Sequence, residues 1–119
     1  MKKTILVVED DNDILFVTKA FLEGQDYQVL TAENGADALQ LIQQHGAPHL
    51  ILLDMKMPIM DGWQFAGEFL DKYDHLSPIV VMTAAGNAEQ RAIDIGAKGW
   101  VGKPFDLDIL LSKIKQFEK

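Results

Sequence analysis

Apolar residues follow two different spacings along the chain. Three short runs are apolar at every position, which is typical of strands buried on both faces of a parallel sheet. These runs are residues 5–8, 50–53 and 79–82. Two less uniform runs, residues 27–32 and 99–101, predict two further strands. The pattern therefore predicts five strands, with the three apolar runs in the middle of a covered sheet.

The segments between these strands carry apolar residues at helical spacing. Five helices are predicted, at residues 13–23, 36–45, 63–73, 87–95 and 106–117. In the first helix, Val17 and Leu22 fall on one apolar face. Gly24, Gly46 and Gly96 each follow a predicted helix, as glycine commonly does at a helix C-terminus. Alternating strands and helices imply one α/β domain with a parallel sheet, right-handed crossovers and helices on both faces.

Polar side chains gather where the predicted strands end. Glu9 and Asp10 follow the first strand, and Asp54 follows the third. Thr83 comes directly after the fourth strand, and Lys103 comes shortly after the fifth. Ligands of such sheets bind outside the carboxyl ends of the strands. We therefore expect these five side chains to share one edge of the sheet.

Carboxylates crowded at one edge repel each other unless a cation lies among them. Lys103 is one candidate cation, and Mg²⁺ is another because carboxylate, carbonyl and water oxygens suit it. Phosphoryl transfer needs groups that position and stabilise the charged phosphoryl group, and a metal, a lysine and a threonine hydroxyl can do this. An aspartate beside them can be the covalent acceptor. Asp11 is equally well explained as the N-cap of the first helix.

Composition narrows the possible functions. The 119 residues fit one domain, and the chain contains no cysteine, which excludes disulfides, thiolate zinc sites and cysteine nucleophiles. The net charge of −7 argues against direct binding to nucleic acid or to a membrane surface. The N-terminal apolar run is too short for a secretory signal, and no run is long enough to cross a membrane. A cytoplasmic location is expected.

With these residues at its strand ends, the chain resembles the receiver domains of response regulators in two-component systems. Within that family it resembles the single-domain regulators of the chemotaxis type. The resemblance spans residues 1–119 as one domain and rests on a series of motifs in the correct order. These are Ile5-Leu6-Val7-Val8-Glu9-Asp10-Asp11, Leu52-Leu53-Asp54-Met55-Lys56-Met57-Pro58, Met60-Asp61-Gly62, Val81-Met82-Thr83-Ala84, Gly96-Ala97 and Lys103-Pro104-Phe105. The implied fold is flavodoxin-like, a doubly wound (βα)5 sheet with strand order 2-1-3-4-5.

The resemblance also implies a role for each residue of the site. Asp54 would accept the phosphoryl group, Thr83 would hydrogen-bond it, and Lys103 would pair with it. Asp10, Asp54 and the backbone carbonyl of Lys56 would bind Mg²⁺ directly, and Glu9 would act through water. The Lys103–Pro104 peptide would be cis.

Partners and a switch follow from the same resemblance. The phosphoryl donor would be a sensor histidine kinase or a histidine phosphotransfer protein, and the downstream protein target is unknown. Thr83 and Trp100 would form the switch, with tryptophan where tyrosine or phenylalanine is usual. Phe16 and Ile109 lie off the apolar faces of the first and last helices, where receivers meet partners, so both are candidate partner-binding residues. A monomer is expected, with dimerisation on phosphorylation left open.

Three other functions compete with this interpretation. A haloacid-dehalogenase-like phosphatase would carry a second aspartate two residues after Asp54, where this chain has Lys56. A pseudo-receiver that acts without phosphate would usually have lost the acceptor, the acidic pair or the lysine, and all are present. A nucleotide-binding flavodoxin-like domain would need a phosphate-binding glycine loop after the first strand, which is absent. We expect self-directed phosphotransfer and autodephosphorylation, without turnover of an outside substrate.

Overall fold

Five parallel strands form one sheet in the order β2-β1-β3-β4-β5. The structure is a computed structural model that describes residues 2–74, 76–84, 87–103 and 106–117. The strands are β1 (Thr4–Val8), β2 (Gln28–Ala32), β3 (Leu50–Asp54), β4 (Ile79–Ala84) and β5 (Gly99–Lys103). This topology confirms the predicted flavodoxin-like arrangement. Pro104 lies outside the described residues, and with it the predicted cis peptide.

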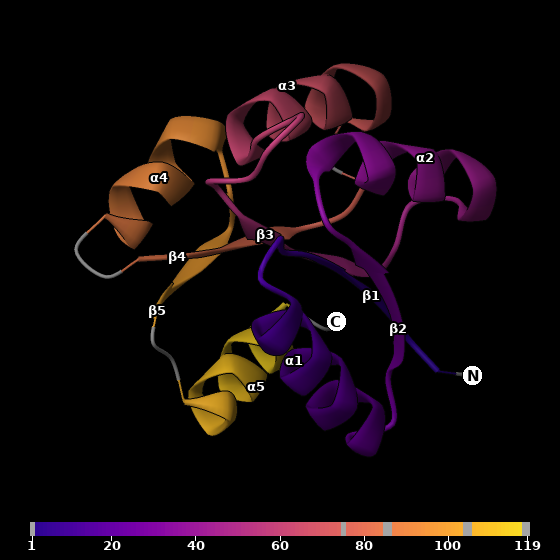
Figure 1. The fold of residues 1–119 in the computed structure, drawn as a ribbon, viewed down its shortest axis with the longest axis vertical. Helices are drawn as coiled ribbons and strands as arrows, with labels where there is room; N and C mark the ends of the chain where they lie inside the picture. Colours follow the sequence, from indigo (N-terminus) through magenta and orange to yellow (C-terminus); the bar gives the residue numbers. More distant parts are fainter. Residues whose placement is uncertain (1, 75, 85–86, 104–105, 118–119) are drawn as a thin grey trace.

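Helices cover both faces of the sheet. Helices α1 and α5 lie on one face, and α2, α3 and α4 lie on the other (Figure 1). Their bounds are α1 (Asn12–Gly24), α2 (Gly35–His45), α3 (Gly62–Tyr73), α4 (Ala88–Ile95) and α5 (Leu107–Gln116). No helix in the described ranges is long and apolar enough to span a membrane.

The strands of uniform apolar character lie between two hydrophobic cores. Successive side chains of a strand point to opposite faces. Ile5 and Val7 of β1 therefore enter the core beneath α1 and α5, whereas Leu6 and Val8 enter the core beneath α2, α3 and α4. A strand segment buried on both faces favours apolar side chains at every position, which explains the apolar runs 5–8, 50–53 and 79–82 of the three central strands. In these strands, polar side chains come only at or near the strand ends, as Asp54 and Thr83 do.

Each of the five predicted helices begins and ends within one residue of its observed bounds. Asp11 is the N-cap of α1, because its side chain accepts hydrogen bonds from the backbone N–H groups of Asp13 and Ile14. The placement of Val17 on the buried face was wrong, since its side chain is half exposed. The buried stripe of α1 is narrower than predicted, and its fully buried members are Thr18 and Leu22.

Candidate functional site

The carboxyl ends of four adjacent strands converge on one edge of the sheet. Asp54 is the last residue of β3 and pairs in register with Met82 of β4, so that Thr83 is one step further along. Lys103 ends β5 and pairs with Ala84. Because β3 is the central strand, Asp54 lies in the middle of this edge. The register thus brings residues far apart in the chain to one place.

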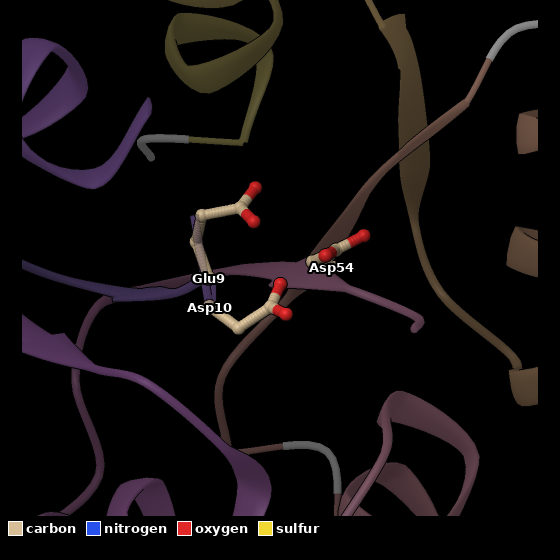
Figure 2. A group of neighbouring side chains, drawn as sticks. All are labelled: Glu9, Asp10 and Asp54. Atoms are coloured by element: carbon tan, nitrogen blue, oxygen red, sulfur yellow. The ribbon is translucent and has the colours of Figure 1, made fainter. Parts of the chain in front are cut away.

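Three carboxylates meet at this edge. Glu9, Asp10 and Asp54 each offer one oxygen, and these oxygens lie within 4.8 Å of one another. Figure 2 shows Glu9 and Asp10 after β1 and Asp54 on the adjacent strand. Glu9 is fully buried and Asp54 is 5% exposed, whereas Asp10 is exposed. The cluster is therefore open to solvent on the side of Asp10.

Lys103 lies against the buried side of this cluster. Its Nζ is 2.5 Å from Oε1 of Glu9 and 3.5 Å from Oδ2 of Asp54. The side chain is largely buried, with one fifth of its surface exposed. A desolvated ammonium so close to two carboxylates stabilises their charges more strongly than a surface ion pair would.

Burial dominates the titration of the two buried carboxylates, Glu9 and Asp54. Burial raises the pKa of Glu9 to about 7, although the hydrogen bond from Lys103 lowers it. The pKa of Asp54 is raised as well, because burial outweighs the charge of Lys103. Burial lowers the pKa of Lys103, but its hydrogen bond to Glu9 and the charge of Asp54 outweigh burial, so the net shift is upward. In the part of the chain that the structure describes, the cluster thus places three carboxylates beside one lysine, an excess of acidic groups.

Backbone donors fix the orientation of two of these carboxylates. Oδ1 of Asp54 accepts a hydrogen bond of 2.9 Å from the backbone N–H of Met55. Its other oxygen, Oδ2, is the one closer to Lys103. Oε2 of Glu9 accepts from the backbone N–H of Asp11 at 3.1 Å. Asp54 is thus held with one oxygen toward its own backbone and the other toward the lysine.

The remaining residues predicted for this site lie on the same edge. Thr83 is 6% exposed near the end of β4. Lys56 is exposed on the loop after β3, two residues beyond Asp54. Oxygen donors from Glu9, Asp10 and Asp54 fit a hard divalent cation such as Mg²⁺, whose charge would offset the excess of carboxylates.

Three predicted residues lie away from the acidic cluster. Trp100 of β5 is 37% exposed, and Nζ of Lys113 from α5 is 5.4 Å from the centroid of its ring. The indole therefore faces outward. Phe16 on α1 and Ile109 on α5 are 73% and 56% exposed, as their off-face positions predicted. Lys113 could not be predicted from the sequence, because its contact with Trp100 joins a helix to a strand and leaves no local spacing signal.

The fold and the cluster define a doubly wound α/β protein with an acidic, lysine-containing pocket at the carboxyl edge of its sheet. The family model described as response regulator receiver domain matches residues 5–115. The chain belongs to this family, the signalling domains of two-component systems, as its motifs predicted. Receiver domains bind Mg²⁺ at an acidic pocket and are phosphorylated by histidine kinases or phosphotransfer proteins.

Curated relatives include both short and long proteins. Sporulation initiation phosphotransferase F of Bacillus subtilis is 32% identical over 119 residues, which cover 98% of this chain and 94% of that protein. Response regulator GtcR of Aneurinibacillus migulanus is 31% identical over 108 residues, which cover 89% of this chain and 43% of that protein. The chain thus spans less than half the length of the latter.

Solved structures agree along the whole chain. The response regulator TrrA from Thermotoga maritima, in complex with Mg(2+)-BeF, has a TM-score of 0.85 and 34% identity, with 98% of this chain and 99% of that chain covered. The chemotaxis response regulator CheY4 of Vibrio cholerae has a TM-score of 0.88 and 28% identity, with the same coverage. These similarities confirm the predicted chemotaxis-regulator-like fold.

Proposed function

We propose that this chain is the phosphoacceptor of a two-component or phosphorelay system and that Asp54 takes the phosphoryl group. One observation carries the proposal. The Asp54 carboxylate is nearly buried at the centre of the edge, with Oδ1 on the Met55 N–H and Oδ2 facing Lys103. A protein catalyses phosphoryl transfer mainly by orienting the nucleophile and stabilising the charge of the transferring group. The contacts of Asp54 provide both.

The transfer step exchanges one bond to phosphorus for another. An oxygen of Asp54 attacks the phosphorus of a phosphohistidine on the kinase or phosphotransfer protein, and an acyl phosphate O–P bond forms. The P–N bond breaks, and its electron pair stays on the imidazole nitrogen of the donor. Lys103 stabilises the negative charge of the transferring group, and the Thr83 hydroxyl donates a hydrogen bond to one of its oxygens.

The donor set of the site suits Mg²⁺. Asp10, Asp54 and the backbone carbonyl of Lys56 would bind the ion directly, and Glu9 would hold it through water. When bound, the ion supplies positive charge beside the transferring phosphoryl group. The three carboxylate oxygens within 4.8 Å of one another support this assignment.

Phosphorylation would then change the surface formed by α4, β5 and α5. The new dianion draws Thr83 toward it, and the space so vacated accepts the indole of Trp100. The outward, partly exposed position of Trp100 is the starting point that such a movement requires. This is a charge-driven bias on a two-state element.

Phe16 and Ile109 are the proposed partner-binding residues. Phe16 on α1 would contact the phosphoryl donor, and Ile109 on α5 would contact the downstream protein. Their exposure supports these roles, because large apolar side chains at the surface are available for contact. Neither nucleic acid nor a membrane is proposed as a direct partner, and the chain is proposed to be a cytoplasmic monomer, with dimerisation on phosphorylation left open.

Residues 1–119 are proposed to form one receiver domain that acts on itself. Its chemistry would be phosphotransfer to Asp54 and autodephosphorylation, without an outside metabolite. The alternative is a pseudo-receiver that binds its partner without phosphate. The intact acidic cluster and Lys103 favour the first function.

Intact-mass measurement after incubation with acetyl phosphate tests this proposal. One added phosphoryl group is expected for the wild type with Mg²⁺ and none with chelator. Asp54→Asn should gain no mass, whereas the matched variant Asp71→Asn, at an exposed carboxylate of α3, should behave like the wild type. Phosphorylation of Asp54→Asn would refute the assigned acceptor. If the wild type gains no mass either from acetyl phosphate or from histidine kinases, the result would favour the pseudo-receiver.

A further inference from the structure

The first residue of α3 packs directly against the backbone that carries Asp54. A Cβ atom on Gly62 would lie 2.8 Å from the carbonyl oxygen of Asp54 and 2.8 Å from Cα of Met55. It would also lie 2.7 Å from Sδ of Met55. Real Cβ atoms essentially never come so close to other heavy atoms. Gly62 does not have a positive φ, so the requirement for glycine here is one of space and not of backbone conformation.

Hydrogen bonds connect the same glycine to the acceptor side chain. The N–H of Gly62 donates to the carbonyl oxygen of Met55 at 2.9 Å. The N–H of Met55 in turn donates to Oδ1 of Asp54, also at 2.9 Å. Met55 is thus held through both of its backbone polar groups and is fully buried. A displacement of Met55 by α3 would move the donor that orients the Asp54 carboxylate.

A second glycine holds the other end of the same loop. The N–H of Gly35, at the start of α2, donates to the carbonyl oxygen of Met60 at 2.8 Å. A Cβ on Gly35 would meet that oxygen at 3.0 Å, Cγ of Met60 at 2.8 Å and Cβ of Phe65, in α3, at 2.9 Å. The loop from β3 to α3 is therefore held at two points. Gly62 of α3 binds its first residue, Met55, and Gly35 of α2 binds Met60 near its end.

We propose that Gly62 is a positioning residue for phosphoryl transfer, because its lack of a side chain lets α3 hold the Met55 backbone where it orients Asp54. The inference rests on the proposed function, since it concerns the rate at which Asp54 is phosphorylated. Gly62 touches neither the donor nor the phosphoryl group. Its effect passes through the Met55 backbone, and displacements of this kind near a reacting group cost up to about a hundredfold in rate.

Gly62→Ala and Gly67→Ala form a matched pair of test variants. Both glycines lie in α3, but a Cβ on Gly67 would meet nothing within 4 Å. Phosphorylation by acetyl phosphate is followed by intact mass at saturating Mg²⁺ over a range of donor concentrations. Gly62→Ala is expected to lower the rate at saturating donor by about tenfold or more, with little change in the half-saturating concentration. Gly67→Ala is expected to keep the wild-type rate.

A double variant separates the backbone from the side chain of Met55. In Met55→Ala a Cβ on residue 62 would no longer meet Sδ of Met55, but it would still meet the carbonyl oxygen of Asp54 and Cα of Met55. Adding Gly62→Ala to Met55→Ala is therefore expected to reproduce the fall in rate. Wild-type rates for Gly62→Ala, or full rescue in the Met55→Ala background, would overturn the proposal.

Urea unfolding of each variant distinguishes an effect on stability from an effect on positioning. A merely structural role of Gly62 would lower the free energy of unfolding without lowering the phosphorylation rate of the folded protein. If Gly62→Ala does not fold, Gly35→Ala tests the same loop from the α2 side. It is expected to slow phosphorylation about threefold or more by displacing Met60 and, through Phe65, α3, and a wild-type rate there would overturn the proposal. An unphosphorylated wild type would instead contradict the proposed function itself.

Discussion

The buried carboxylate of Glu9 makes the metal-free protein less stable as the pH rises. Burial raises its pKa from 4.5 to about 7 in the folded chain. Between these values the folded state keeps a proton that the unfolded state has released. The free energy of unfolding therefore falls as the pH rises through this range. Below pH 4.5 both states are protonated, and the penalty is absent.

The size of the effect follows from the same shift. One pKa unit corresponds to about 1.4 kcal/mol, so this shift corresponds to about 3 kcal/mol in total. This is a large part of the stability of a small domain, which is about 5–15 kcal/mol. Glu9→Gln removes the charge and keeps the shape. The variant should match the wild type near pH 4.5 and exceed its unfolding free energy by about 3 kcal/mol at about pH 8.

Urea unfolding in the presence of a chelator, at several pH values from about 4.5 to about 8, measures this difference. Glu68→Gln is the matched control because Glu68 is exposed on α3, and it should differ from the wild type by less than about 0.5 kcal/mol at every pH. With Mg²⁺ the wild type should regain stability at high pH, since the ion replaces the proton. A difference between Glu9→Gln and wild type that is independent of pH, or that favours the wild type at high pH, would refute the reasoning.

Three further predictions concern the surface of the protein. Ile59 has a positive φ of 68° and is 82% exposed, so Ile59→Asn should raise the free energy of urea unfolding by about 1 kcal/mol; an unchanged midpoint would contradict this. In the phosphorylated protein, Lys113→Met should favour the inward position of Trp100 and lower acrylamide quenching of its fluorescence in a Trp63→Phe background, because the exposed cation–π contact that is lost is worth about 0.5–1 kcal/mol; equal quenching would show that the contact does not hold the indole outward. Phe16→Ala should slow phosphorylation by the cognate histidine kinase but not by acetyl phosphate, and equal slowing by both donors would exclude a docking role.

The sequence was sufficient to predict the layers of the fold. A strand segment covered by helices on both faces is apolar at successive positions. A helix that covers a sheet has one apolar face, so its apolar residues recur about every 3.6 positions. Because the two periods differ, the strand and helix positions can be distinguished from the amino-acid sequence alone. Parallel strands bring their carboxyl ends to one edge, so Asp54 could be placed with Glu9 and Asp10. The motifs around them were enough to predict the family.

The tertiary structure alone decided how these side chains meet. Lys103 pairs with both Glu9 and Asp54, and that geometry depends on the register of β4 against β5. The space requirement at Gly62 is invisible in the chain, where Asp61-Gly62 resembles an ordinary turn. Local spacing predicts which face of its own element a residue occupies. It does not say which atoms of other elements come within 3 Å, and those contacts determine burial, titration and the orientation of Asp54.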